Sequence, residues 1–257
     1  MPYADSNGYD IYYEIEGHGS PLLLHHGLTM TIDDWRDIGY VKALEKDYKL
    51  ILMSPLGHGL SDKPHQSCAY TSYRRVSDIV SVLDQLNIQK TQMLGYSLGG
   101  RAALEMMAYA PDRIVSAAIG GSGPALRNPS RYSPMQSILE KGMDSWIDMV
   151  KRTRWPATPK WESRARANDL QALFTLLSTP MESLRNPLKA NKIPALFYIG
   201  NKDFNYDLVS GHVEDLQNSE KLILEGLDHV EGFSQIHTVI HPITDFLRRT
   251  AIKKQFC

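Results

Sequence analysis

The hydrophobic positions of the chain fall into short apolar runs that are separated by stretches with helical spacing. The runs occupy 22–24, 50–53, 93–94, 114–119, 195–199 and 222–224. Between them, apolar residues recur every three or four positions, as they do from Val76 to Leu86. Buried strands that alternate with amphipathic helices are typical of a parallel sheet covered on both faces. The pattern therefore predicts an α/β fold with a mainly parallel central sheet.

The first fifty residues add two local predictions. Asn7 and Gly8 form a favoured tight-turn pair, and apolar and polar residues alternate over 11–15, so a β-hairpin is expected at the start. Farther along, the spacing of apolar residues predicts one helix between Ile32 and Lys46.

The alternation of strand-like runs with helical spacing stops between residues 123 and 192. This stretch has no strand-like run; it holds helical patterns interrupted by prolines, and it contains three of the four tryptophans, Trp146, Trp155 and Trp161. We expect residues 1–122 and 193–257 to form the core and residues 123–192 to form a helical cap inserted between two strands. The alternative is that these helices extend the core. Basic residues outnumber acidic ones here, which we interpret as a solvated helical face.

Composition narrows the class of protein. The 257 residues are 42% hydrophobic and 22% charged, as in a globular domain, and 28 basic residues nearly balance 29 acidic ones. This balance gives no reason to expect a nucleic acid or a membrane as partner. Two cysteines, Cys68 and Cys257, fit a reducing compartment better than a structural disulfide. With no signal peptide or membrane-length apolar stretch in view, we expect a cytoplasmic protein.

The motif that carries chemistry is GYSLG at 95–99. It lies between the apolar run at 93–94 and a helical pattern over 98–109, so Ser97 is predicted at a strand-to-helix corner. A serine on such a strained turn projects its hydroxyl above the edge of the sheet, and glycine is needed two residues to either side because a Cβ would crowd the backbone.

A serine hydroxyl is a weak nucleophile and needs a base, which in turn needs an orienting acid. In a parallel sheet, groups that meet project from loops at the carboxyl ends of strands. Three such loops supply Ser97, Asp203 and His229, in that order. Asp207 remains a rival for the acid, whereas Asp228 directly precedes the histidine and is poorly placed to reach its far ring nitrogen.

The motif and the order of these three residues resemble the α/β-hydrolase superfamily, and the resemblance extends from the opening hairpin to the final helix, the cap excepted. It implies Ser97 as nucleophile, His229 as general base and acid, and Asp203 as the residue that fixes the histidine tautomer. Some relatives carry the acid one strand earlier, but the loop at 120–123 has no carboxylate.

The resemblance also implies an oxyanion hole. The sequence HHGL at 25–28 is similar to the family's His-Gly signature, so the backbone N–H groups of Leu28 and Leu98 are expected to bind the oxyanion. His26 is expected to hold this loop. The sequence GHGLS at 57–61 resembles a family turn that relatives usually begin with aspartate, where this chain has Ser54.

A metal at His25 and His26 is not expected, because adjacent residues of a strand face opposite ways. No cofactor is expected either, since acyl transfer needs only proton transfer and backbone dipoles. The expected function is hydrolysis of a small or medium carboxylic ester, thioester or lactone, with a small molecule as the only predicted partner. Two alternatives stay open: a cofactor-free perhydrolase that uses the same triad, and a ligand receptor of this fold with slow or no turnover.

Overall fold

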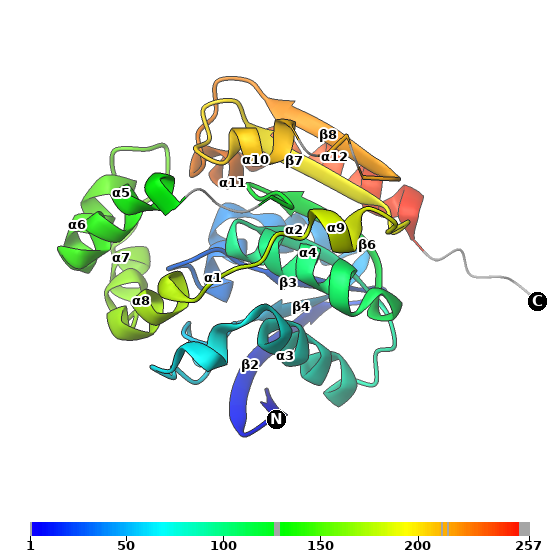
Figure 1. Cartoon of the computed structure of the whole chain (residues 1–257), viewed down its shortest axis with the longest axis horizontal. Helices are drawn as coiled ribbons and strands as arrows, with labels where there is room; N and C mark the ends of the chain where they lie inside the picture. Colours follow the sequence, from blue (N-terminus) through cyan, green and yellow to red (C-terminus); the bar gives the residue numbers. More distant parts are fainter. Residues whose placement is uncertain (1, 126–128, 212, 215, 252–257) are drawn as a thin grey trace, which may run out of the picture.

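The computed structural model describes residues 2–125, 129–211, 213–214 and 216–251. Its centre is an eight-stranded sheet with the order β1-β2-β4-β3-β5-β6-β7-β8 (Figure 1). The strands are Tyr3–Ser6 (β1), Tyr9–Gly17 (β2), Ser20–His25 (β3), Tyr48–Met53 (β4), Thr91–Tyr96 (β5), Ile114–Gly120 (β6), Ala195–Gly200 (β7) and Ser219–Leu224 (β8). Every pair from β4 to β8 is parallel, while β2 pairs antiparallel with β1 and β4. The predicted mainly parallel sheet is confirmed.

The opening hairpin is β1–β2. Asn7 and Gly8 take φ values of 52° and 85°, as a two-residue turn with both central residues at positive φ requires.

Helices cover both faces of the sheet. Those that pack on it are Ile32–Ile38 (α1), Tyr40–Leu44 (α2), Ser72–Gln85 (α3), Leu98–Tyr109 (α4), Tyr206–Ser210 (α10) and Ile236–Thr250 (α12). Leu23 and Ile51 contact the side of α3 and α4, whereas Leu22 and Leu24 contact the side of α1, α2 and α12. Because successive residues of a strand face opposite ways, the continuous apolar runs bury both faces. The remaining short elements are Ser67–Tyr70 (η1), Pro111–Arg113 (η2) and Glu231–Ser234 (α11).

One predicted helix is wrong in its extent. The helix expected between Ile32 and Lys46 is divided into α1 and α2 by Gly39, whose φ is 104°. A residue in the left-handed region ends a helix, and glycine adopts that conformation without a steric cost.

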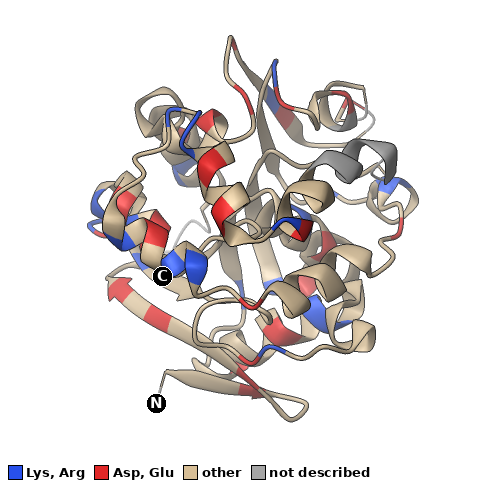
Figure 2. Cartoon of the chain, turned by 90° about the vertical axis from the view of Figure 1, so that its left-hand side faces the viewer, with Lys and Arg blue, Asp and Glu red and all other residues tan. Residues whose placement is uncertain are grey.

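Between β6 and β7 the described residues form helices. They are Pro129–Glu140 (α5), Met143–Val150 (α6), Pro159–Arg166 (α7), Leu170–Ser178 (α8) and Arg185–Leu188 (α9), and we call residues 129–188 the α5–α9 segment. Helices α5 to α8 lie together beside the sheet layer (Figure 1) and share a small apolar core of their own, which includes Trp146, Ile147 and Trp161. Seen from this side, basic and acidic residues are interspersed (Figure 2).

No helix in the described ranges is both long and apolar enough to pass through a bilayer.

Candidate active site

Ser97 stands between the end of β5 and the start of α4, with φ 55° and ψ −108°. The two flanking glycines are required by close backbone contacts. A Cβ on Gly95 would lie 2.2 Å from the carbonyl oxygen of Gly99, and a Cβ on Gly99 would lie 1.7 Å from the carbonyl oxygen of His25. The tight corner predicted from the sequence is therefore present, with the serine at its tip.

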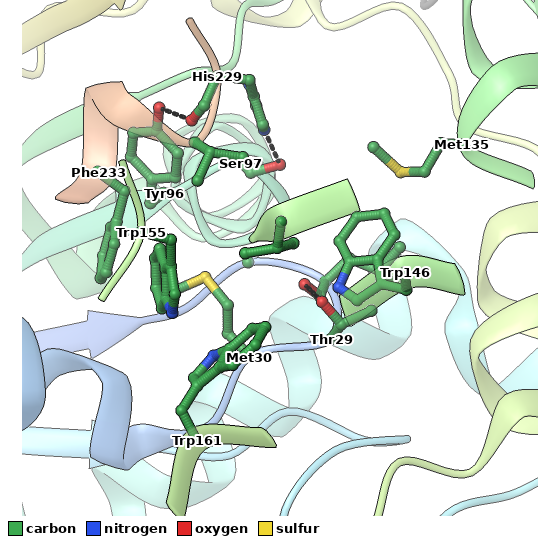
Figure 3. Close-up of a pocket in the computed structure, with 14 residues that line it drawn as sticks. Thr29, Met30, Tyr96, Ser97, Met135, Trp146, Trp155, Trp161, His229 and Phe233 are labelled. Carbon is green, nitrogen blue, oxygen red and sulfur yellow. Dashed lines mark hydrogen bonds between the residues drawn. The ribbon is translucent and has the colours of Figure 1, made fainter. Parts of the chain in front are cut away.

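The three residues predicted from distant loops lie in one hydrogen-bonded row. His229, in the loop between β8 and α11, places Nε2 2.9 Å from the Oγ of Ser97 (Figure 3) and Nδ1 2.7 Å from the Oδ2 of Asp203. A carboxylate can only accept, so Nδ1 carries the proton and Nε2 of the neutral ring accepts from the serine hydroxyl. Asp203 follows β7 and is 4% exposed.

The carboxylate of Asp203 is itself held in place. The N–H of Asn205 donates to Oδ1 of Asp203 at 2.7 Å, and the amide of Asn205 donates to the carbonyl of Gly121 at 2.9 Å. Both rival carboxylates lie elsewhere: Asp207 is exposed on α10, and Asp228 accepts from the N–H groups of the two residues that follow His229. Sequence reasoning missed Asn205, which no motif distinguishes.

The backbone of His229 is anchored by the elbow. The hydroxyl of Tyr96 donates to the carbonyl of His229 at 2.6 Å (Figure 3), and burial raises the pKa of this tyrosine well above 10, so it remains a donor. Gly121, with φ 60°, leaves room for the ring, because a Cβ there would lie 2.9 Å from Cε1 of His229. Sequence reasoning missed the role of Tyr96, although its place next to Ser97 was a signal.

The loop after β3 passes beside Ser97. A Cβ on Gly27 would lie 3.4 Å from the Cβ of Ser97, and Leu28 lines the same cavity as the serine. The carbonyl of Gly27 accepts from the ring of His26 at 2.9 Å and from the N–H of Met30 at 3.3 Å. In a trans peptide the N–H points away from the carbonyl, so the Leu28 N–H is turned away from the His26 ring and from the Met30 N–H.

Leu98 begins α4, and the first N–H groups of a helix have no acceptor within the helix. Leu98 directly follows Ser97, and Leu28 lines the same cavity as the serine. The binding of an oxyanion by these two N–H groups stays a prediction.

An apolar cavity adjoins Ser97 and His229 (Figure 3). The α5–α9 segment contributes five side chains to its wall: Met135, Trp146, Val150, Trp155 and Trp161. The rings of Trp155 and Phe233 stack with their centroids 5.7 Å apart. Among the described residues of its wall there is no aspartate, glutamate, lysine or arginine. An uncharged group suits this wall better than a charged one.

His25 and His26 are both buried, and burial lowers the pKa of each. Within the described ranges, no three histidine, cysteine or acidic side chains are grouped so as to hold a metal ion.

The chain belongs to the α/β hydrolase fold family, whose model matches residues 20–202. Among curated relatives, a Bacillus subtilis (strain 168) protein provisionally named 2-succinyl-6-hydroxy-2,4-cyclohexadiene-1-carboxylate synthase is 32% identical over 65% of this chain. The match spans 62% of that relative, so the chain covers less than two thirds of its length.

Solved structures share the fold over nearly the whole chain. An enol-lactonase from Burkholderia xenovorans LB400 has a TM-score of 0.84 at 21% identity and covers 96% of this chain and 100% of its own. An esterase from Rhodococcus sp. ECU1013 has a TM-score of 0.84 at 19% identity, covering 98% and 100%. At these identities the two structures show a shared fold.

Proposed function

We propose that the protein is a serine hydrolase that cleaves a small or medium carboxylic ester, thioester or lactone through an acyl-enzyme on Ser97. The observation that carries the proposal is the hydrogen-bonded row of Ser97, His229 and Asp203, with separations of 2.9 and 2.7 Å. Such a row is the arrangement that turns a serine hydroxyl into a nucleophile at neutral pH.

The steps follow from the geometry. The Oγ of Ser97 attacks the ester carbonyl while its proton moves to Nε2 of His229, and the resulting imidazolium is stabilised by the carboxylate of Asp203. The N–H groups of Leu28 and Leu98 bind the oxyanion. His229 then returns the proton to the leaving alcohol as the carbonyl re-forms. Water, deprotonated by the same imidazole, attacks the acyl-enzyme and releases the acid.

The substrate class follows from the cavity. Its wall is apolar and rich in tryptophan, and the described lining residues include no Asp, Glu, Lys or Arg side chain, so a charged acyl or alcohol group would lose its hydration without a partner. We therefore assign it an uncharged, apolar group, and the α5–α9 segment serves as the cap that supplies this wall. Short aliphatic or aryl esters fit better than esters that carry a second carboxylate.

The test compares wild type with Ser97→Ala on p-nitrophenyl esters of increasing acyl length. Loss of the nucleophile is expected to lower kcat by a factor on the order of 10³ or more. The control Ser145→Ala, at a half-buried position outside the cavity wall, should keep wild-type turnover. A fluorophosphonate probe should label wild type and spare Ser97→Ala. Labelling of another residue, or a single turnover accompanied by a ligand-induced thermal shift, would contradict the proposal, and the latter would favour a receptor.

A further inference from the structure

Thr29, one residue beyond Leu28, has a strained backbone. Its φ is 66°, and it is buried. A β-branched residue in the left-handed region is a conformational outlier, and such a conformation persists only where its surroundings hold it. Because this residue follows directly on the proposed oxyanion donor, whatever holds Thr29 also shapes the oxyanion loop.

Two long-range hydrogen bonds hold Thr29, one on each of its peptide groups. Its N–H donates to Nε2 of His58 at 3.2 Å, and its carbonyl accepts from Nδ2 of Asn168 at 3.0 Å. His58 belongs to the turn after β4, and Asn168 lies between α7 and α8. The loop is therefore tied to the core on one side and to the α5–α9 segment on the other.

Both partners are themselves fixed. Since the Thr29 N–H can only donate, Nε2 of His58 must accept, so the ring carries its proton on Nδ1, which donates to the carbonyl of Leu56 at 3.2 Å. This ring is fully buried and is not part of the cavity wall. Asn168 also donates to the carbonyl of Ala165 at the end of α7, at 3.0 Å.

We propose that His58 and Asn168 are positioning residues for the oxyanion hole. By holding both peptide groups of Thr29 they keep the loop in its strained form, and this form directs the Leu28 N–H toward the oxyanion. Because Asn168 belongs to the α5–α9 segment, the oxyanion hole is complete only while that segment is seated on the core. The inference rests on the proposed hydrolase function.

The consequence is specific to the transition state. A ground-state ester leaves only a weak carbonyl acceptor near the loop, whereas the tetrahedral intermediate carries a full oxyanion. Loss of the Asn168 bond therefore lowers kcat and leaves KM nearly unchanged. A residue with a merely structural role would instead change thermal stability, without lowering kcat selectively over KM.

The experiment uses Asn168→Asp, which keeps the shape of the side chain and replaces the donor with a charged acceptor that repels the Thr29 carbonyl. Asn168→Ala removes the donor without adding a charge. On p-nitrophenyl butyrate we expect kcat to fall about 10-fold or more, with KM within about twofold. The inhibition constant of an alkyl trifluoromethyl ketone, which forms an oxyanion on the serine, should rise by the same factor as kcat/KM falls. The matched control is Asn218→Asp, which loses a bond from Nδ2 to the Lys192 carbonyl and keeps wild-type kinetics.

A second arm tests the backbone itself. Glycine adopts a positive φ without steric cost, so adding Thr29→Gly to Asn168→Ala should restore part of the kcat that Asn168→Ala alone loses. Should Asn168→Asp fail to fold, this pair carries the test with the same readouts.

An unchanged kcat in folded Asn168→Asp, an unchanged inhibition constant, or no recovery in the double variant would each overturn the inference. Failure of the hydrolase proposal is recognised separately, by wild type that turns over no ester.

Discussion

At the scale of single residues, the elbow combines chemistry with strain. Ser97 is held at φ 55°, a conformation that costs a residue with a Cβ about 1–3 kcal/mol. We expect Ser97→Gly to be more stable than Ser97→Ala by about 1 kcal/mol. Both variants lack the hydroxyl, but only glycine relieves the strain, and its greater backbone entropy in the unfolded state offsets part of that gain. Urea unfolding of the two variants measures the difference. Equal stability would show that the elbow is not strained.

Tyr96 gives a second prediction at this scale. Tyr96→Phe removes the donor to the His229 carbonyl while it keeps the ring. Because the imidazole then moves relative to Ser97, kcat should fall by roughly 10-fold with little change in KM. Tyr109→Phe, which removes an exposed hydroxyl bond at 3.3 Å, serves as the control. Steady-state kinetics decide, and a kcat equal to that of wild type would remove Tyr96 from the site.

At the scale of elements, α7 is attached to α1 through an ion pair. Arg164 donates from Nη2 to Asp34 at 3.0 Å and to Asp37 at 2.5 Å, and Asp34 is 1% exposed. Burial raises the pKa of Asp34 to about 6 even with this arginine beside it. Removing the cation would leave a buried carboxylate without its partner, which is far more costly than losing an exposed pair.

Arg164→Met should therefore lower the free energy of unfolding by about 2–4 kcal/mol at pH 7.5. The loss should shrink at pH 5, where a buried carboxyl without a cation takes up a proton. Arg166→Met, on the same helix with half-exposed pairs, should lower the free energy of unfolding far less. Urea titrations at both pH values test this, and equal losses for the two arginines would contradict it.

At the scale of the whole molecule, buried histidines lower the free energy of unfolding at acid pH. Burial lowers the pKa of His25 and His58 to about 4 and that of His26 well below 6.5. The unfolded chain therefore binds protons from about pH 6.5 downward while the native state does not, so stability falls as pH falls toward 4. Asp34 and Asp78, whose pKa burial raises to about 6, act in the opposite direction and offset part of the loss.

One histidine can be isolated from this sum. Between pH 7 and pH 5, the free energy of unfolding of His25→Asn should fall by about 2 kcal/mol less than that of wild type. The reason is that one group whose proton binding differs between the folded and unfolded states is gone. The control His241→Asn, at an exposed position, should keep the wild-type loss. Free energies of unfolding from urea titrations at the two pH values provide the comparison, and parallel curves for His25→Asn and wild type would refute it.

The alternation of apolar runs with helical spacing was enough to predict a mainly parallel sheet covered by helices on both faces. It also predicted that Ser97, Asp203 and His229 lie at one edge of the sheet, although the serine and the histidine are 132 positions apart in the sequence. The physical reason is general: the carboxyl ends of parallel strands share an edge, so loops far apart in sequence converge there. Gly39 shows the limit, because the same apolar spacing fits one helix or two until the φ of a single residue is known.

By itself, then, the sequence determined the fold class and the tight turn at Ser97, and it predicted the three residues that form the hydrogen-bonded row. Only the tertiary structure decided what supports them: Asn205 beneath Asp203, Tyr96 beneath His229, and His58 with Asn168 on either side of Thr29. These are bonds from side chains to backbone groups. They depend on how closely two segments approach, and no local periodicity or motif encodes that distance.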